Sequence, residues 1–469
     1  MLNFDIGKKN IVSIFLIFAL IFSCIYIGWL IVNPPSIKFI FVSILVIFFF
    51  IFLLKLEIGI YFLVFLSPLL YFTPSFYIGP FRFWIEDILI VMILFLWLFK
   101  IALKKEFYEI PPLQTSIFVF IFFALLNIFI SIIVFSYSFQ EIINAIRIFM
   151  KEWVEYIILY LICFNLIKTK KQIKIVMASL LIGAFISVFI LKFSKQGIME
   201  GRMGGGLSDI SDAYYSPNVF GLFCVIMISL CLFYFMYTTN IFKKVFFAIL
   251  SIPFISLLIE TASRSAFFCF IALFIIIFFV TKKKIIILGI PFLIWTYFHL
   301  PPDVMLRMKS TLELSKDIGY KENAMIINIF GKEFIPEGST VLRLKYLLDL
   351  PSSIMTFFFC GLGYVEMPID NNFFSILVHY GFFVLCFFVR ILIIFGKKIK
   401  ENINKTKDIF FKKINQNILT ILIIISIFAF SSRAFTSPRI SILFWILMAI
   451  SMRSEDWCQE NEQKNEIER

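Results

Sequence analysis

Residues 115–136 read TSIFVFIFFALLNIFISIIVFS and carry no charged side chain. A helix of this length can cross the hydrocarbon core of a bilayer, which takes about 20 apolar residues. Comparable apolar blocks recur along the chain, so the protein is 61% hydrophobic and 16% charged, with a mean hydropathy of +0.98. These values exclude a soluble cytosolic enzyme, a disordered chain and a small secreted domain. The sequence predicts an all-α polytopic membrane protein.

Lysine clusters predict how the apolar blocks alternate across the membrane, because Lys is enriched in cytoplasmic loops. Starting the chain in the cytoplasm places every Lys cluster on that side. The first block follows Lys8 and Lys9, and no small-residue cleavage site follows it, which favours an uncleaved helix over a signal peptide. We expect about 14 transmembrane helices with both termini cytoplasmic. The expected spans are 11–32, 37–54, 58–73, 86–103, 115–136, 150–167, 173–192, 217–239, 245–260, 265–281, 285–299, 372–396, 417–432 and 438–452.

This topology divides the chain into three regions. Residues 1–192 form an N-terminal bundle of seven spans. Residues 193–396 hold two large outer loops, 193–216 and 300–371, and are expected to be the catalytic half. The second loop is rich in Leu and contains short helix-like stretches, which favours helices lying at the membrane surface over disorder. Residues 397–469 supply a cytoplasmic loop, the last two spans and an acidic tail.

The arginines are distributed differently from the lysines, which cluster on the predicted cytoplasmic side. The net charge of +13 is scattered between apolar blocks, so it does not indicate a nucleic-acid partner. Most of the arginines fall on the predicted outer side, where solubility of the loops is one explanation. The guanidinium fork, however, is suited to two-point contact with phosphate or carboxylate, which predicts an outward-facing site for an anionic ligand. The outer arginines are Arg82, Arg147, Arg202, Arg264, Arg307, Arg343, Arg433 and Arg439.

The sequence offers little for a metal or a disulfide. Six of the eight cysteines lie inside apolar blocks, and the two histidines are far apart. Asp209 and Asp212 lie three residues apart in a Gly- and Ser-rich loop, where capping or solvation is the favoured role. We therefore expect no metal site and no cofactor.

Four stretches are singled out by their order and their shared outer side. The first motif, RMGGGLSDISDAYYSPNVFG (202–221), contains Arg202 and opens a span at Pro217-Asn218. The second motif, ETASRSA (260–266), puts Arg264 at a tight turn between two spans. The third motif, STVLRLKYLLDLPSSIMTFFFCGLGYVE (339–366), has Arg343 on a helix and later a Gly-Leu-Gly run. The fourth motif, DNNFFSILVHYG (370–381), opens the next span.

Together these motifs resemble the O-antigen polymerase and ligase superfamily, whose members are membrane glycosyltransferases that use lipid-diphosphate-linked sugars. The resemblance covers about residues 195 to 395. Ligases of this superfamily have His-Asn where this chain has Asp370-Asn371, so the polymerase branch is favoured. The resemblance implies a bacterial inner membrane protein that acts on an undecaprenyl-diphosphate-linked oligosaccharide. It also implies a chain-length regulator as partner, with O-antigen or capsular polysaccharide as the product.

Residue roles follow from the chemistry of the leaving group. We expect Arg202, Arg264 and Arg343 to converge on the lipid diphosphate, because fixed positive charge at a departing group is a large catalytic term. Asp370 is the candidate general base for the acceptor hydroxyl, although N-capping of the following span is the competing role. Glu260 would orient Arg264 by an ion pair if the intervening turn is helical. Reserves for the base are Glu366, Asp349 and Asp303, and supporting roles are expected for Asn218, Asn371, Gly361 and Gly363.

Three alternatives stay open on the sequence alone. A ligase would hand the finished glycan to a lipid core or a protein. A flippase or transporter would move the same lipid-linked sugar, but transporters favour internal repeats and mid-membrane charges, and we find no repeat. A scaffold without chemistry leaves the distribution of Arg unexplained.

Overall fold

The computed structural model of the chain describes residues 51–72, 76–78, 81–105, 107–194, 198–199, 202–203, 216–282, 289, 305, 327–329, 332–334, 358–359, 361–363 and 371–467. Three expected spans therefore lie largely outside the described residues. They are 11–32, 37–54, of which 51–54 are described, and 285–299, of which 289 is described. The chain divides into two units: Met1–Leu63 with Pro74–Phe107, and Val64–Thr73 with Tyr108–Arg469.

The first unit contains most of helix α3 (Leu56–Leu66), then a short antiparallel hairpin and helix α4 (Ile85–Ala102). The hairpin pairs β1 (Phe76–Ile78) with β2 (Phe81–Phe83). Close packing of α3 on α4 needs a glycine, because a Cβ at Gly59 would lie 3.0 Å from Cγ1 of Ile93. The side chain of Asp87 accepts a 2.9 Å hydrogen bond from the Trp84 backbone and so satisfies a free donor at the start of α4.

The second unit is a bundle of helices with two further short hairpins. Its elements are η1 (Ser67–Phe72), α5 (Gln114–Phe135), α6 (Phe139–Phe149), η2 (Met150–Val154), α7 (Glu155–Leu166), α8 (Lys170–Ser194), β3 (Ile198–Met199), β4 (Arg202–Met203), α9 (Pro217–Tyr237), α10 (Ile241–Glu260), α11 (Arg264–Thr281), β5 (Ile327–Ile329), β6 (Lys332–Phe334), α16 (Asn372–Tyr380), α17 (Phe382–Lys405), α18 (Ile409–Ala429) and α19 (Pro438–Ile467).

Among the described residues, six helices are long and apolar enough to cross a membrane: α5, α8, α9, α10, α11 and α18. The protein is thus an all-α, multi-pass membrane protein by helix length and composition. The larger number of 14 spans stays a prediction. The helices α17 and α19 are also long, but each carries a charged stretch at its C-terminal end.

Two expected spans take a more detailed form in the structure. The span expected at 150–167 belongs to a longer helix that runs from Phe139 to Leu166 through the π-helical turn η2. The helix starts early because Ser138 and Glu141 form a capping box. The span expected at 58–73 is an α-helix that tightens into the 3₁₀ turn η1.

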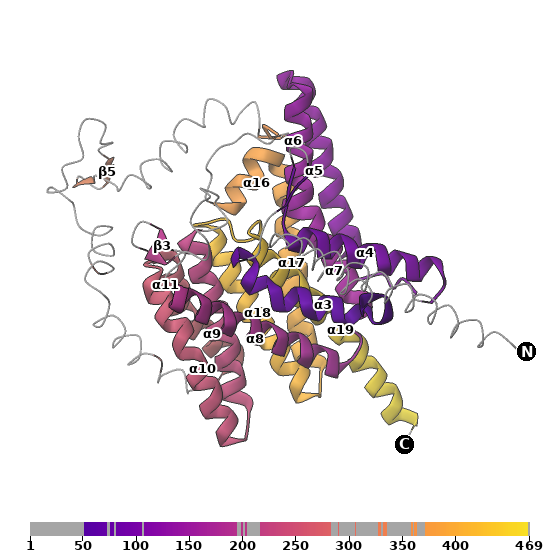
Figure 1. Cartoon of the computed structure of the whole chain (residues 1–469), viewed down its shortest axis with the longest axis vertical. Helices are drawn as coiled ribbons and strands as arrows, with labels where there is room; N and C mark the ends of the chain where they lie inside the picture. The colour runs from indigo at the N-terminus through magenta and orange to yellow at the C-terminus, as the bar shows by residue number, and fades with distance from the viewer. Residues whose placement is uncertain are drawn as a thin grey trace, which may run out of the picture. The chain divides into compact units, whose positions relative to one another are not determined.

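Helix α9 is the centre of one group of helices. It packs against α10, α11 and α18, and Figure 1 shows α9, α10 and α11 side by side. Its apolar window is 78% buried, against 22% for α10. An apolar helix enclosed on most sides is held by its neighbours, whereas α10 keeps most of its surface available to lipid.

Buried aromatic rings pack against one another between α5, η2, α17 and α19. Trp153 of η2 contacts Phe120 of α5 at a ring-centroid distance of 5.2 Å and Phe388 of α17 at 5.0 Å. Phe388 in turn meets Phe435, which contacts Phe444 of α19 at 5.1 Å. These edge-on contacts fill the interior between α5, η2, α17 and α19, and edge-to-face pairs of this kind favour one fixed packing.

Candidate functional site

The connection between α18 and α19, residues 430–439, is a short polar turn in the protein interior. It reads FSSRAFTSPR, and most of its side chains are buried. Pro438 starts α19, a position where its missing N–H costs nothing. Ser441 closes the turn by donating a 2.6 Å hydrogen bond to the Phe435 carbonyl. We call this segment the 430–439 turn, and all four motifs contact it either directly or through a neighbouring motif.

The fourth motif binds the 430–439 turn through two asparagines. Asn371 is the N-cap of α16, because its Oδ1 accepts a 3.0 Å hydrogen bond from the Phe374 backbone. Its Nδ2 donates to the carbonyl of Phe430 at 2.9 Å. Asn372 is fully buried, and its Oδ1 accepts a 2.8 Å hydrogen bond from the backbone of Phe435. The start of α16 is therefore held against the turn by both amides.

The third motif packs on the fourth through backbone hydrogen bonds and two glycines. The backbone N–H of Leu362 donates to Val378 at 2.7 Å. Gly361 and Gly363 have φ of +73° and +68°, which other residues rarely adopt. A Cβ at Gly361 would also lie 2.6 Å from the His379 carbonyl oxygen. Both expected supporting glycines thus have a structural reason to be glycine, in the turn that leads to the fourth motif.

His379, at the end of the fourth motif, is buried inside α16. Its Nδ1 lies 3.0 Å from Oγ of Ser375, one helical turn earlier.

The first motif packs on the second where α9 meets the turn between α10 and α11. A Cβ at Gly221 would lie 2.6 Å from that of Ala266 and 3.1 Å from Oγ1 of Thr261. The turn itself is tight, because Ala262 has a φ of +48° and Ser263 then caps α11. Only a glycine on α9 allows this close approach.

Arg439 joins the first pair of motifs to the 430–439 turn. Its side chain is fully buried, and the guanidinium carbon lies 5.1 Å from the ring centroids of both Phe220 and Phe223 on α9. Its Nη2 donates a 3.1 Å hydrogen bond to the carbonyl of Pro68 in η1. A buried guanidinium held by aromatic faces and a carbonyl is a fixed positive charge. The turn therefore connects to motifs one and two on one side and to motifs three and four on the other.

A second charged group of the turn faces helix η2. Nη1 of Arg433 lies 4.0 Å from Oε1 of Glu152, and their side chains are 20% and 10% exposed. Glu152 lies on the π-helical turn, a feature that often marks a functional position. A carboxylate that is largely buried in a membrane protein, with an arginine beside it, is a functional-site candidate by itself.

The residues expected to act on the diphosphate are only partly described. Arg264 is the first residue of α11, beside the Gly221 contact. Arg202 pairs with Met199 in the small β3–β4 hairpin. Arg343 and the candidate base Asp370 lie outside the described residues, as do Glu366, Asp349 and Asp303. Asn371 is the N-cap of α16. The capping role that was considered for Asp370 therefore belongs to the residue that follows it.

The structure gives Glu260 other partners than the expected one. Helix α10 ends at Glu260, and Thr261 and Ala262 form a non-helical turn before α11. The condition for an ion pair with Arg264 at helical spacing is therefore not met. Glu260 instead pairs with Lys192 of α8 and accepts a 3.1 Å hydrogen bond from Ser256. Asn218, in the first turn of α9, is held by a 3.3 Å hydrogen bond from its backbone N–H to Oγ of Ser216.

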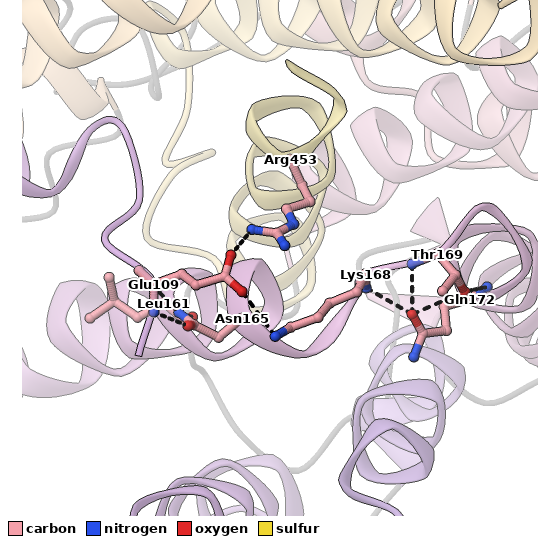
Figure 2. A network of polar contacts seen from close by, with 7 residues as sticks. All are labelled: Glu109, Leu161, Asn165, Lys168, Thr169, Gln172 and Arg453. Atoms are coloured by element: carbon pink, nitrogen blue, oxygen red, sulfur yellow. Dashed lines mark hydrogen bonds and ion pairs between the residues drawn. The ribbon is translucent and has the colours of Figure 1, made fainter. Parts of the chain in front are cut away.

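The opposite ends of the helices are joined by a separate polar cluster, which Figure 2 shows from close by. Glu109, in the loop before α5, pairs with Lys168 at 2.9 Å and with Arg453 of α19. Asn165 of α7 accepts a 2.7 Å hydrogen bond from the backbone of Glu109. Burial raises the pKa of Glu109, but hydrogen bonds from Arg453 and Lys168 outweigh it and the pKa is lowered.

These contacts agree with the alternating topology. Glu109, Lys168 and Arg453 are all expected on the inner side, and so are Lys170 and Asp408, which pair at 2.7 Å. The contacts of Asn371 and of Glu260 join helix ends that are all expected on the outer side. The candidate site and the Glu109 cluster therefore lie at helix ends of opposite predicted sides.

No known protein-family model matches the sequence, and no curated protein sequence matches it either. In the part of the chain that the structure describes, no group of three or more His, Cys, Asp or Glu side chains is arranged to hold a metal ion.

The sequence places Arg433 and Arg439 among the outer arginines but assigns neither a role in the site. Glu152 lies in an apolar block and has no assigned role from the sequence. One signal was present: a carboxylate inside an expected span is costly unless it has a partner. The identity of that partner was not readable, because it comes from a distant part of the chain.

Proposed function

We propose that this protein is a membrane glycosyltransferase that polymerises undecaprenyl-diphosphate-linked oligosaccharide repeat units at the outer face of a bacterial inner membrane. The product would be O-antigen or a capsular or exopolysaccharide. The proposal rests on one observation: the 430–439 turn contacts the first motif on one side and the fourth motif on the other. Asn371 binds Phe430, and Arg439 lies on Phe220 and Phe223. Stretches that resemble one family in sequence order thus form one connected region.

The reaction requires two kinds of group from the protein: positive charges at the leaving group and a base for the acceptor hydroxyl. A hydroxyl of the acceptor glycan attacks the anomeric carbon that is bonded to the lipid diphosphate, a new glycosidic C–O bond forms, and the bond to the diphosphate oxygen breaks. Undecaprenyl diphosphate leaves with its extra negative charge, and the hydroxyl proton goes to a base. Positive groups fixed in advance stabilise the leaving group, and a nearby carboxylate takes the proton.

Roles for individual residues follow from this chemistry. Arg202, Arg264 and Arg343 would hold the diphosphate, and Asp370 would be the base. Arg264 is well suited to its role, because it starts α11 and the N-terminus of a helix also favours a phosphate. Asp370 immediately precedes Asn371, whose two hydrogen bonds hold the start of α16. Arg433 and Glu152 add a charge pair to the same region.

The test is an assay with purified protein in lipid nanodiscs and a lipid-diphosphate repeat unit as the only sugar substrate. Glycans longer than one repeat unit are the expected product. Transfer to an added lipid core without lengthening would identify a ligase instead. Movement of the lipid-linked sugar across sealed vesicles, with no new glycosidic bond, would identify a flippase and overturn the proposal.

A further inference from the structure

A cavity of about 320 Å³ opens between the end of α5 and the start of α6. This volume is near the lower end of the range for small-ligand pockets, about 300–1,000 Å³, and gives room for a short segment of glycan. The side chains that matter for its chemistry are Ser131, Tyr137, Glu141, Asn144 and Arg147. Gly363 of the third motif completes the wall.

The polar wall of this cavity is built into helix α6. Glu141, Asn144 and Arg147 recur every three residues, so they lie along one face of the helix. Ala145, which also lines the cavity, and Phe149 are buried. Ser138 fixes the first of the three, because its backbone N–H and its hydroxyl both donate to Oε2 of Glu141 at 2.7 Å. The carboxylate of Glu141 is thus held in place at the cavity wall.

The same cavity is attached to the third motif. Tyr137 donates a 2.7 Å hydrogen bond to the carbonyl of Leu362, which fixes its ring at the cavity wall. A Cβ at Gly363 would lie 2.6 Å from Oγ of Ser131. Leu362 is in turn bonded to the fourth motif through Val378. The cavity is therefore connected through Tyr137, Leu362 and Val378 to helix α16 of the fourth motif.

Its lining presents donors, acceptors and an aromatic ring together. The amide of Asn144 has both kinds of hydrogen-bonding group, the guanidinium of Arg147 donates, and the carboxylate of Glu141 accepts. Tyr137 adds an amphipathic ring. A sugar ring has hydroxyls around its rim and C–H faces above and below, so it can use each of these groups at once. Ile132, Ile142 and Ile148 also line the cavity and could contact either the C–H face of a sugar or an acyl chain, so it is the polar groups that favour a sugar.

We propose that this cavity binds a sugar residue of the acceptor glycan. The proposal rests on the proposed function for the distinction between acceptor and donor. The donor diphosphate would be held by Arg264, which lies on the side of motifs one and two. The cavity instead adjoins the third motif through Gly363, and the third motif is hydrogen-bonded to the fourth, to which the proposed base belongs. A subsite on this side of the site is where the acceptor is needed.

The binding test uses cysteine protection in intact cells or nanodiscs. Asn144→Cys is labelled with a membrane-impermeant maleimide, with and without the delipidated repeat-unit glycan released by mild acid from cells that make this protein. Gln140→Cys is the matched control, because Gln140 is exposed on the same helix and does not line the cavity. Labelling is measured above that of the unchanged chain. We expect the glycan to slow labelling at position 144 several-fold and to leave position 140 unchanged.

A kinetic test separates acceptor from donor. Asn144→Ala is expected to raise the KM for the acceptor glycan about tenfold and to leave the KM for the lipid-linked donor unchanged, because the lost hydrogen bonds serve the acceptor alone. A rise in the donor KM instead would overturn the assignment to the acceptor.

The outcomes distinguish this proposal from the proposed function. If the unchanged protein lengthens glycans but the glycan protects neither position, the cavity is not a glycan site and the polymerase proposal stands. If the glycan protects position 144 but no lengthening occurs, the cavity binds glycan and the polymerase proposal fails.

Discussion

Asn371 joins the start of α16 to the end of α18, because its Nδ2 donates a 2.9 Å hydrogen bond to the carbonyl oxygen of Phe430. The other side of the same amide caps α16 through the Phe374 backbone. One side chain thus performs a local task and a long-range task, and substitutions can separate the two.

The two Asn371 variants are expected to differ from each other in stability and to lose activity to a similar extent. Asn371→Ser keeps a capping oxygen and loses the bond to Phe430, which costs about 1 kcal/mol of unfolding free energy. Asn371→Ala loses both and costs about 2 kcal/mol. Both variants are expected to slow glycan lengthening by about tenfold or more, because the 430–439 turn loses its position relative to the fourth motif. Thermal unfolding in detergent and the nanodisc assay measure the two effects.

Asn240 provides the matched control for capping alone. It caps α10 by accepting hydrogen bonds of 2.9 and 3.3 Å from two backbone N–H groups, at the predicted inner side. Asn240→Ala is expected to cost about 1 kcal/mol with unchanged activity. If Asn371→Ser also keeps full activity, the bond to Phe430 has no part in the site.

The pair formed by Glu152 and Arg433 is expected to be energetically coupled. Removing either partner leaves the other charge largely buried, and Glu152→Gln or Arg433→Gln should each cost about 1–3 kcal/mol. The double variant should cost less than the sum by about 1 kcal/mol. Chemical or thermal unfolding of the four proteins gives this coupling. A cycle of Glu152 with Arg390, an exposed arginine of α17, should be additive.

The contact between α9 and α11 depends on two small residues. Gly221→Ala places a Cβ 2.6 Å from that of Ala266 and is expected to destabilise the protein by about 1–3 kcal/mol. Ala266→Gly in the same chain should recover part of this loss, although it costs about 1 kcal/mol by itself. Unfolding of the single and double variants checks the expectation.

Gly396 is the control for that experiment. A Cβ there would meet only Cδ2 of Leu422 at 3.6 Å, an ordinary contact inside helix α17. Gly396→Ala is therefore expected to be neutral or to stabilise the helix by up to about 1 kcal/mol. Destabilisation of Gly221→Ala with no recovery in the double variant would mean that Ala266 is not the neighbour that matters.

The Glu109 cluster predicts a pH-dependent contribution to stability. The pKa of Glu109 is lower in the folded protein than in the unfolded chain, so its stabilising effect is present above the unfolded value, about 4.3, and is lost as the pH falls through the folded value. Glu109→Gln should lower stability at neutral pH by about 1 kcal/mol or less, since solvent screens these half-exposed groups. The difference from the unchanged protein should shrink below about pH 4.3.

The arginine clamp predicts a specific loss of activity. Arg264→Lys and Arg343→Lys keep the charge but lose the two-point fork, and each is expected to lower the rate of glycan lengthening by about 100-fold. Asp370→Asn should lower it by about 100-fold or more because the base is lost. Chain-length distributions from cells and initial rates in nanodiscs measure these effects. Full-length polysaccharide from both Lys variants would contradict the clamp, and normal turnover in Asp370→Asn would remove it as the base.

The sequence alone determined the features that depend on neighbours along the chain. Apolar length and the Lys clusters predicted the described membrane helices and the grouping of their ends. Local caps such as Ser138 with Glu141 were also within reach of sequence reasoning, because the residues that make them lie within one turn. The third motif showed its glycines, although not what they pack against.

Only the tertiary structure decided which distant residues meet. Helix α9 is apolar all round, so no stripe in its sequence reveals that α10, α11 and α18 enclose it. The pairing of Glu152 with Arg433, the burial of Arg439 against α9 and the cavity beside Gly363 each bring together residues far apart in the chain. A charged or polar side chain inside an apolar bundle must find a partner, but which partner it finds depends on how the helices are packed.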